Sequence, residues 1–424
     1  MTAACSKATN VLVTIGASGG GVVEALVADA MIATPARTAT ASFAGPVALP
    51  MSFGVALPDV SALVSVTLHA TMLDGGTQVA SGMIESVPHR QVVLALTLDG
   101  VGASDGGDGG DLSLANDLAG ADLSPVVHAW QSPPLSPAPA ARTSARMVYD
   151  SARGVDVLFG GRDQNGPMND TWELGASGWT QRTPATSPGA RWGFAAAYDS
   201  ARHVTVLFAG ATPGADDGET WEYDGSNWSK RTTAHAPGAR HSGAMAYDST
   251  RHVCVLFGGI GGSTQLGDTW EYDGNDWTKM TPTASPPTLN AQDMVYDAAR
   301  RRVVMFGGKG PSSQTWEYDG TTWTHETPAH APPARRSAAL VFDDVRNRAV
   351  LFGGNAEGGG GAGSIDLGDS WEYDGSDWTQ IMLSGPSARR SPAAAFDEAR
   401  GRLVLFGGSQ GANTRVPVAD TWTY

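Results

Sequence analysis

The sequence predicts an all-β protein in two parts, a small β-sandwich followed by a closed ring of six repeated four-stranded sheets. Two observations lead to this fold class. The chain of 424 residues contains 54 glycines and 25 prolines, and only 17% of its residues are charged. This composition is typical of short strands joined by turns rather than of long helices. In addition, most of the chain repeats one pattern six times, with a period near 49 residues.

The charge balance excludes some classes of function. Lys and Arg number 28 and Asp and Glu number 43, which gives a net charge of −15. A surplus of negative charge argues against nucleic-acid binding and against docking on anionic lipid. No apolar run reaches membrane-spanning length. Hydrophobic residues make up 41% of the chain, which is enough for a core.

Residues 1–9 are predicted to form an N-terminal tether. Cys5 follows Thr2-Ala3-Ala4, and small residues before a cysteine are typical of the end of a bacterial lipoprotein signal. The charged and apolar regions that should precede them are absent. A start site upstream, a trimmed chain and a chance likeness all stay open, and so does a frayed terminus with an incidental cysteine. The second cysteine, Cys254, lies inside a repeated strand and is assigned to packing.

Residues 10–100 are predicted to form about seven strands in a small immunoglobulin-like β-sandwich. Apolar and polar residues alternate from Val64 to Met72, and Asp74-Gly75-Gly76 marks a hairpin turn. Residues 101–124 then carry repeated Gly and Asp but no Lys or Arg. We interpret them as an acidic linker, with a calcium loop as the weaker alternative because the Asp spacing is not that of an EF-hand.

Residues 125–424 contain the repeats. Each repeat holds an aromatic-Asp pair, then a β-branched run ending in Phe and a small-residue doublet, then a first Trp, and in most copies a second Trp seven residues later. The pairs are Tyr149-Asp150, Tyr198-Asp199, Tyr247-Asp248, Tyr296-Asp297, Phe342-Asp343 and Phe396-Asp397; the first tryptophans are Trp172, Trp221, Trp270, Trp316, Trp371 and Trp422.

This pattern resembles the kelch repeat, the unit of galactose-oxidase-like β-propellers. The resemblance implies six blades of four strands each. The sixth repeat ends at Tyr424 without its second Trp, but Trp130 stands 12 residues before Arg142, the same spacing that Trp179 has to Arg191. We therefore predict that residues 126–130 form the outer strand of the last blade and close the ring.

Antiparallel strand order places alternate loops on opposite rims of such a ring. The Asp-x-x-Arg turn between the first two strands, as in Asp150 to Arg153, occurs six times and is predicted to be a structural lock. The loops between the second and third strands vary in length and composition, and the links between blades carry His235 and His330. The rim with these loops and links, called the variable rim below, is the expected binding face.

Seven residues on this rim are candidate ligand contacts. Five arginines occupy one repeat position, which Leu289 takes in the fourth blade. They suit a carboxylate or sulfate ligand, but pairing with the repeated Glu173, Glu222, Glu271, Glu317 and Glu372 is the favoured alternative. Trp192 and His241 each follow one arginine, and Trp192 suits a sugar ring or packing under a loop. The seven candidates are Arg142, Arg191, Trp192, Arg240, His241, Arg335 and Arg389.

No catalytic motif is recognisable, and we predict no catalytic residue and no metal site. His235, His241 and His330 lie where a metal site is a weak alternative. The resemblance raises galactose oxidase, whose copper radical site needs histidines, tyrosines and a cysteine cross-linked to a tyrosine. Cys254 lies mid-strand, so copper is not expected. No cofactor is predicted, although calcium is left open. The resemblance also includes bacterial sialic-acid mutarotases, but no motif specific to them is present.

The sequence thus predicts a non-catalytic recognition module that binds a glycan or a protein through the variable rim. The alternative is a carbohydrate-active enzyme, of epimerase or oxidase type, at the mouth of the propeller channel. The 24 arginines against four lysines, with abundant Ala and Gly, are typical of a GC-rich genome. We expect a monomer at the bacterial cell surface, in the periplasm or secreted, with membrane contact only through a lipid anchor at Cys5.

Overall fold

The computed structural model describes residues 130–309, 312–356, 364–381, 385–411 and 415–424 and the backbone of seven strands between residues 9 and 98. The chain forms two compact units, Met1–His128 and Ala129–Tyr424. Cys5, the predicted linker 101–124 and residues 126–129 of the predicted closing strand lie outside the described residues. In the described part, no helix is long and apolar enough to cross a membrane.

The first unit contains two sheets. One has the order β4-β1-β7 and the other β3-β2-β5-β6. β5 and β6 form the antiparallel pair that the Asp74-Gly75-Gly76 signal predicted, whereas β1 and β7 pair in parallel. The immunoglobulin-like packing of these sheets stays a prediction. The strands are β1 (Thr9–Ala17), β2 (Val22–Ala33), β3 (Ala36–Ala48), β4 (Met51–Leu57), β5 (Ala62–Met72), β6 (Thr77–Ser86) and β7 (Val92–Leu98).

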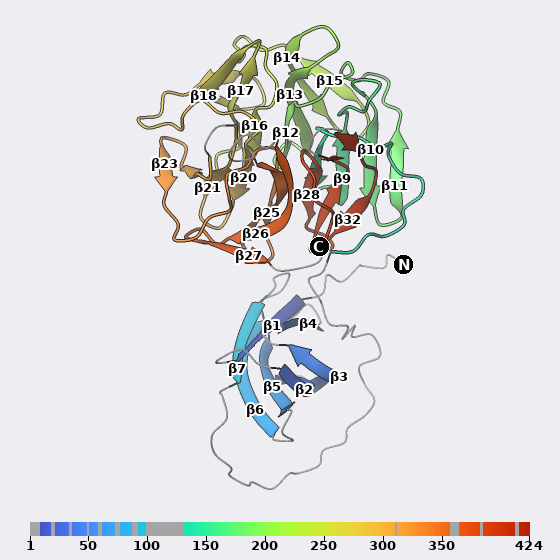
Figure 1. Cartoon of the computed structure of the whole chain (residues 1–424), viewed down its shortest axis with the longest axis vertical. Helices are drawn as coiled ribbons and strands as arrows, with labels where there is room; N and C mark the ends of the chain where they lie inside the picture. Colours follow the sequence, from blue (N-terminus) through green and yellow to red (C-terminus); the bar gives the residue numbers. More distant parts are fainter. Residues whose placement is uncertain are drawn as a thin grey trace. The chain divides into compact units, whose positions relative to one another are not determined.

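The second unit is a six-bladed β-propeller, as predicted, with its blades arranged around a central axis (Figure 1). Each blade is an antiparallel sheet whose first strand lies innermost. Blade 1 comprises β8 (Arg146–Asp150), β9 (Val155–Phe159), β10 (Thr171–Gly175) and β11 (Gly178–Arg182). Blade 2 comprises β12 (Ala195–Asp199), β13 (Val204–Ala211), β14 (Asp216–Tyr223) and β15 (Trp228–Arg231). Blade 3 comprises β16 (Ala244–Asp248), β17 (Val253–Gly261), β18 (Thr264–Tyr272) and β19 (Trp277–Lys279).

Blades 4 and 5 repeat this arrangement, and blade 6 differs at its outer edge. Blade 4 comprises β20 (Asp293–Asp297), β21 (Arg302–Phe306), β22 (Thr315–Tyr318) and β23 (Trp323–Glu326). Blade 5 comprises β24 (Ala339–Asp343), β25 (Arg348–Ala356), β26 (Ile365–Tyr373) and β27 (Trp378–Ile381). Blade 6 comprises β28 (Ala393–Asp397), β29 (Arg402–Phe406) and β32 (Thr421–Thr423), with a small hairpin of β30 (Ser409–Gln410) and β31 (Val416–Pro417).

Blade 6 is completed from the other end of the propeller unit. Gln131 and Thr423 exchange two backbone hydrogen bonds, each 2.8 Å long. Next to this bridge, the Trp130 ring packs against Phe352 and Tyr424 at centroid distances of 5.2 and 5.3 Å. Its Nε1 donates to Ser370 in blade 5 at 3.4 Å. Trp130 therefore occupies the place that the second Trp holds in the other blades.

The core lies between the blades, because a single four-stranded sheet cannot bury both of its faces. The second Trp of each blade donates a hydrogen bond to a hydroxyl of the preceding blade; Trp228 Nε1, for example, reaches Thr171 Oγ1 at 3.0 Å. Trp179 makes the same contact with Thr421 at 3.0 Å, across the seam between blades 6 and 1. Every seam is thus held by an apolar aromatic and one buried polar contact.

The Asp-x-x-Arg turns are structural locks, as predicted. Asp150 Oδ1 accepts hydrogen bonds from the backbone of Ala152 and Arg153, and Arg153 Nε donates to Asp150 Oδ2 at 2.7 Å. Arg153 Nη1 also binds Glu173 at 2.6 Å, and Tyr223 of the next blade donates to the same carboxylate at 3.0 Å. The lock therefore fastens this turn to its own blade and to its neighbour, whereas blade 6 has Thr423 in place of the glutamate.

Candidate functional site

The variable rim is built from the loops that follow the glycine doublets and from the residues that lead into each innermost strand. In blades 2, 3 and 5 the second and third strands continue past the doublet as extended hairpins, each after a β-bulge. These hairpins project their loops from a rigid scaffold, because the strands below them are buried in the seams. The bulges lie at Phe208/Gly210, Phe257/Gly259 and Phe352/Gly354.

The five candidate arginines are buried inside their own blades. Arg142 is 1% exposed, and its Nη1 and Nη2 bind the two oxygens of Asp170 at 2.6 and 2.7 Å. Its Nε and Nη1 also donate to the carbonyls of Ala140 and Gly160. Arg191, Arg240, Arg335 and Arg389 repeat this arrangement with Asp217 and Glu219, Asp268, Asp369 and Asp420, respectively.

These contacts correct the predicted partner. We expected the repeated glutamates to bind these arginines, but Glu173 binds Arg153 of the turn lock at the opposite end of the blade. The actual partner is the acid two residues before the first Trp. Partial burial would raise the pKa of Asp170, but hydrogen bonds from Arg142 and Trp172 and the charge of Arg142 outweigh it and lower this pKa. We therefore assign the five arginines a structural role rather than ligand contact.

Trp192 and His241, in contrast, lie together on the rim surface. Their ring centroids are 5.2 Å apart. The guanidinium carbon of Arg162, from the blade 1 loop, lies 4.0 Å from the centroid of the Trp192 ring. On the other side, His241 Nδ1 lies 2.8 Å from Asp216 Oδ1. We call these four residues, Arg162, Trp192, His241 and Asp216, the rim cluster.

The rim cluster is positively charged at one end. Partial burial and the nearby charge of Arg415 lower the pKa of Arg162. Among the described residues, neither arginine has an acidic partner, whereas Asp216 is paired with His241 and with the backbone of Gly262. Arg415 lies in the loop of blade 6 on this rim. Sequence reasoning missed Arg162, because no repeat position distinguishes it. An uncompensated cation stacked on an aromatic ring suits an anionic group.

A backbone ring surrounds the propeller axis beneath the rim cluster. Ser144, Gly193, Ser242, Ala291, Ser337 and Ser391, one from each blade, are joined head to tail by N–H···O=C hydrogen bonds of 2.6–3.0 Å. All six residues have φ values between 49° and 62°, a region that non-glycine residues seldom adopt. This closed cycle holds the residue before each member, including Trp192 and His241, at a fixed place around the axis.

The predicted placement of His235 and His330 on the variable rim is wrong, so the weak alternative of a metal site shared with His241 has no support. His235 and His330 lie away from the variable rim, because their Nδ1 atoms bind Asp276 and Asp377 in the turns before β19 and β27, each at 2.7 Å. They therefore do not meet His241. In the part of the propeller that the structure describes, no three His, Cys, Asp or Glu side chains are grouped as metal ligands.

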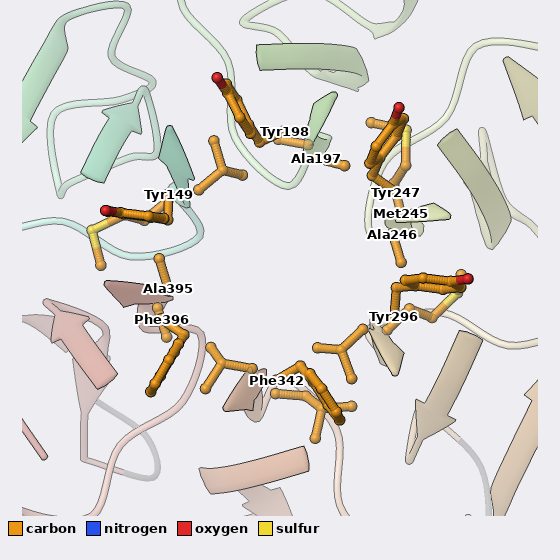
Figure 2. Close-up of a pocket in the computed structure, with 18 of the residues that line it drawn as sticks. Tyr149, Ala197, Tyr198, Met245, Ala246, Tyr247, Tyr296, Phe342, Ala395 and Phe396 are labelled. Carbon is orange, nitrogen blue, oxygen red and sulfur yellow. The ribbon is translucent and has the colours of Figure 1, made fainter. Parts of the chain in front are cut away.

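An axial pocket of about 440 Å³ lies inside the ring of innermost strands. Figure 2 shows Ala197, Ala246 and Ala395 directed toward the axis, while the hydroxyl groups of the tyrosines point away from it. Arg146 of blade 1 crosses the axis to Asp293 of blade 4, and its Nη1 lies 3.0 and 3.1 Å from the two carboxylate oxygens. Sequence reasoning missed this pair, although the other blades carry alanine there.

Comparison with known proteins agrees with the repeat pattern. Residues 103–292 match the family model for the KLHDC2/KLHL20/DRC7 Kelch-repeats domain. This segment includes the first three blades and is slightly less than half of the chain. No curated protein matches the chain.

Proposed function

Because the C-terminal unit is a six-bladed propeller of kelch repeats, a fold that generally mediates protein–protein interaction, we propose that it recognises an acidic segment of a protein partner through the variable rim. The observation that carries this proposal is Arg162 stacked at 4.0 Å on Trp192 with no acidic partner among the described residues. The chain as a whole has a net charge of −15. A local basic site on an acidic protein selects for anionic ligands and repels further copies of the same chain.

The rim cluster offers a partner two kinds of contact. A carboxylate can form a bidentate pair with the Arg162 guanidinium, which the Trp192 ring keeps in a fixed plane. His241 and Asp216 extend the same surface into blades 2 and 3, with hydrogen-bonding groups that are half-buried. A rigid aromatic beside an arginine is typical of the residues that contribute most to binding energy at protein interfaces.

A displayed library of random peptides, selected on the full chain, tests this proposal. We expect peptides rich in Asp and Glu to be enriched, and their binding to weaken as ionic strength rises. Arg162→Glu should weaken binding about tenfold to a hundredfold, because a hydrogen bond to a charged group contributes roughly 1.5–3 kcal/mol. Arg301→Glu, an exposed site on the opposite rim, is the matched control. Enrichment of basic peptides, or unchanged binding by Arg162→Glu, would contradict the proposal.

The sequence also predicted a glycan as the ligand and an enzyme as the alternative function. A sugar stacked on the Trp192 face would have to displace the Arg162 guanidinium, so the geometry favours a protein over a glycan. A glycan array with the same two variants tests the glycan version. The enzyme alternative required Arg, His and a carboxylate together in a deep axial pocket. In the described residues this pocket holds Arg146 and Asp293 but no histidine, which supports the recognition module.

Export to the cell surface, periplasm or medium, with a lipid on Cys5, stays a prediction from the sequence. Its support is the run of small residues before Cys5. Mass spectrometry of the N-terminal peptide from the protein isolated from its own cells tests it. A diacylglyceryl-modified Cys5 is the expected result, and an unmodified thiol would contradict it.

A further inference from the structure

The axial pocket opens at the rim opposite the rim cluster. Its mouth is formed by the residue that follows each aromatic-Asp pair, and most of these six residues are exposed. Its inner end is the Arg146–Asp293 pair. The innermost strand β8 covers five residues between these ends, which at about 3.3 Å per residue makes the pocket about 16 Å deep. The mouth residues are Ser151, Ser200, Ser249, Ala298, Asp344 and Glu398.

The wall of this pocket is apolar midway between its two ends. The residue that faces the axis midway along each innermost strand is Ala or Val, as with Ala246 and Val148. Small side chains here leave the volume of about 440 Å³ free, which lies in the range of small-molecule sites. The middle of the pocket is therefore a tube lined by small apolar side chains, along which an aliphatic stem can lie.

The charge of the pocket is unequal at its two ends. At the inner end, Arg146 and Asp293 neutralise each other, and the Asp293 oxygens also accept hydrogen bonds from the backbone of Met294 and Leu340. At the mouth, both charged residues are acids, Asp344 and Glu398, from neighbouring blades. Asp344 has no hydrogen bond or ion pair with any described residue. The mouth therefore presents a carboxylate that lacks a cation.

We propose that the axial pocket binds a slender organic cation, a primary alkylammonium whose aliphatic stem lies along the Ala and Val wall and whose ammonium group remains at the mouth beside Asp344 and Glu398. The apolar stem gains from leaving water, by about 0.8 kcal/mol for each buried methylene. The ammonium keeps access to solvent at the mouth and supplies the positive charge that Asp344 lacks. This site is separate from the rim cluster and does not depend on the proposed function.

Titration calorimetry of the full chain with three molecules of equal length tests the proposal: octylamine, octanol and octanoate. We expect octylamine to bind most tightly, octanol more weakly and octanoate not at all, because only the head group differs. Asp344→Asn should weaken octylamine binding about tenfold and leave octanol unchanged. Asp163→Asn, which removes a partly exposed carboxylate from the variable rim, should change neither.

Two further variants separate the tube from its mouth. Ala246→Phe fills the tube and should abolish binding of both octylamine and octanol, with circular dichroism used to confirm that the variant is folded. Ala298→Lys changes an exposed mouth residue, so folding is not at stake; its ammonium should compete with the ligand and lower octylamine affinity about tenfold. Equal affinities for the three molecules, no octylamine binding, or octylamine binding that survives Ala246→Phe would each overturn the proposal.

Discussion

Arg142 and Asp170 form a bidentate ion pair inside blade 1, with Nη–Oδ distances of 2.6 and 2.7 Å. The same bidentate pair recurs in blades 3, 5 and 6, and in blade 2 Arg191 binds Glu219 and Asp217 instead. In blade 4 both members of the pair are absent. There Leu289 replaces the arginine, and Gln314 replaces the acid while still accepting a hydrogen bond from Trp316 at 3.1 Å. The two positions change together because a buried arginine without its acid, or the acid without its arginine, would be an unpaired charge.

This relationship predicts a compensated double substitution. Arg142→Leu alone should lower the free energy of unfolding by about 3–5 kcal/mol, since it leaves Asp170 partly buried and unpaired. Arg142→Leu with Asp170→Gln copies blade 4 and should recover most of that loss. Chemical denaturation of the wild type, both single variants and the double variant gives the coupling energy. Additive effects of the two substitutions would contradict the assignment of the pair.

The partner of Arg142 could have been identified from the sequence. Blade 4 has Glu317 but no arginine at the position of Arg142, and blade 6 has Arg389 but Thr423 at the position of the glutamate. The arginines and glutamates are therefore not present in the same five blades, whereas Leu289 and Gln314 depart together. Equal numbers of arginines and glutamates suggested the glutamates as partners. Matching the two sets blade by blade excludes the glutamates and indicates the acid two residues before the first Trp.

The propeller itself was predictable because six copies carry the same signal. Each Tyr-Asp pair, glycine doublet and tryptophan marks a strand end, and agreement among repeats removes the ambiguity of any single strand. The Arg146–Asp293 pair and the rim cluster were not predictable, because their members lie on different blades. Residues 147 positions apart meet only after the ring closes, and no local pattern encodes that distance.

A buried acid at the seam between blades 6 and 1 predicts a stabilising substitution. Asp156 is fully buried, and neither of its carboxylate oxygens has a hydrogen-bond partner among the described residues. Burial, and secondarily the charge of Asp397, raise its pKa well above the ordinary value. As pH rises above about 4, the Asp156 carboxyl group keeps its proton in the folded protein but loses it in the unfolded chain. The free energy of unfolding therefore falls as pH rises.

Asp156→Thr, which copies Thr205 of blade 2, should therefore raise the melting temperature, and the gain should be larger at pH 8 than at pH 4. Calorimetry at the two pH values measures it. The reciprocal variant Thr205→Asp is the matched control: it places the same acid in another seam and should destabilise the protein most at pH 8. A pH-independent effect of either substitution would mean that the acid is neutralised by another route.

Trp130 closes the propeller ring by packing at the seam between blades 5 and 6. Trp130→Ala removes a 7%-exposed ring that packs on Phe352 and Tyr424, and it should cost about 3–5 kcal/mol. Hydrogen exchange should accelerate first in β28, β29 and β32 of blade 6 and only later in blades 2 and 3. Trp130→Phe keeps an aromatic ring but removes the donor to Ser370, so its effect should be smaller. Uniform acceleration in all blades would show that the closure is not a local element.

Asp344 at the mouth of the axial pocket and Asp163 on the variable rim should affect stability with opposite signs as pH changes. Asp344 lies at the mouth of the axial pocket, where surrounding protein reduces the hydration of its carboxylate. This loss of hydration, together with the negative charges of Glu398, Asp343 and Asp297, raises the pKa of Asp344 from 3.8 to about 7. Its folded state holds the proton more tightly, so its contribution to stability falls as pH rises from about 4 to about 7. Asp344→Asn should therefore raise the melting temperature at pH 8 and leave it nearly unchanged at pH 4.

Asp163 is the control of opposite sign. Hydrogen bonds from Asn165 and Gly166 outweigh slight burial and lower the pKa of Asp163. Asp163→Asn should therefore lower the melting temperature at pH 8. The same sign for both variants in calorimetry would contradict the assignment of Asp344 as the uncompensated acid of the mouth.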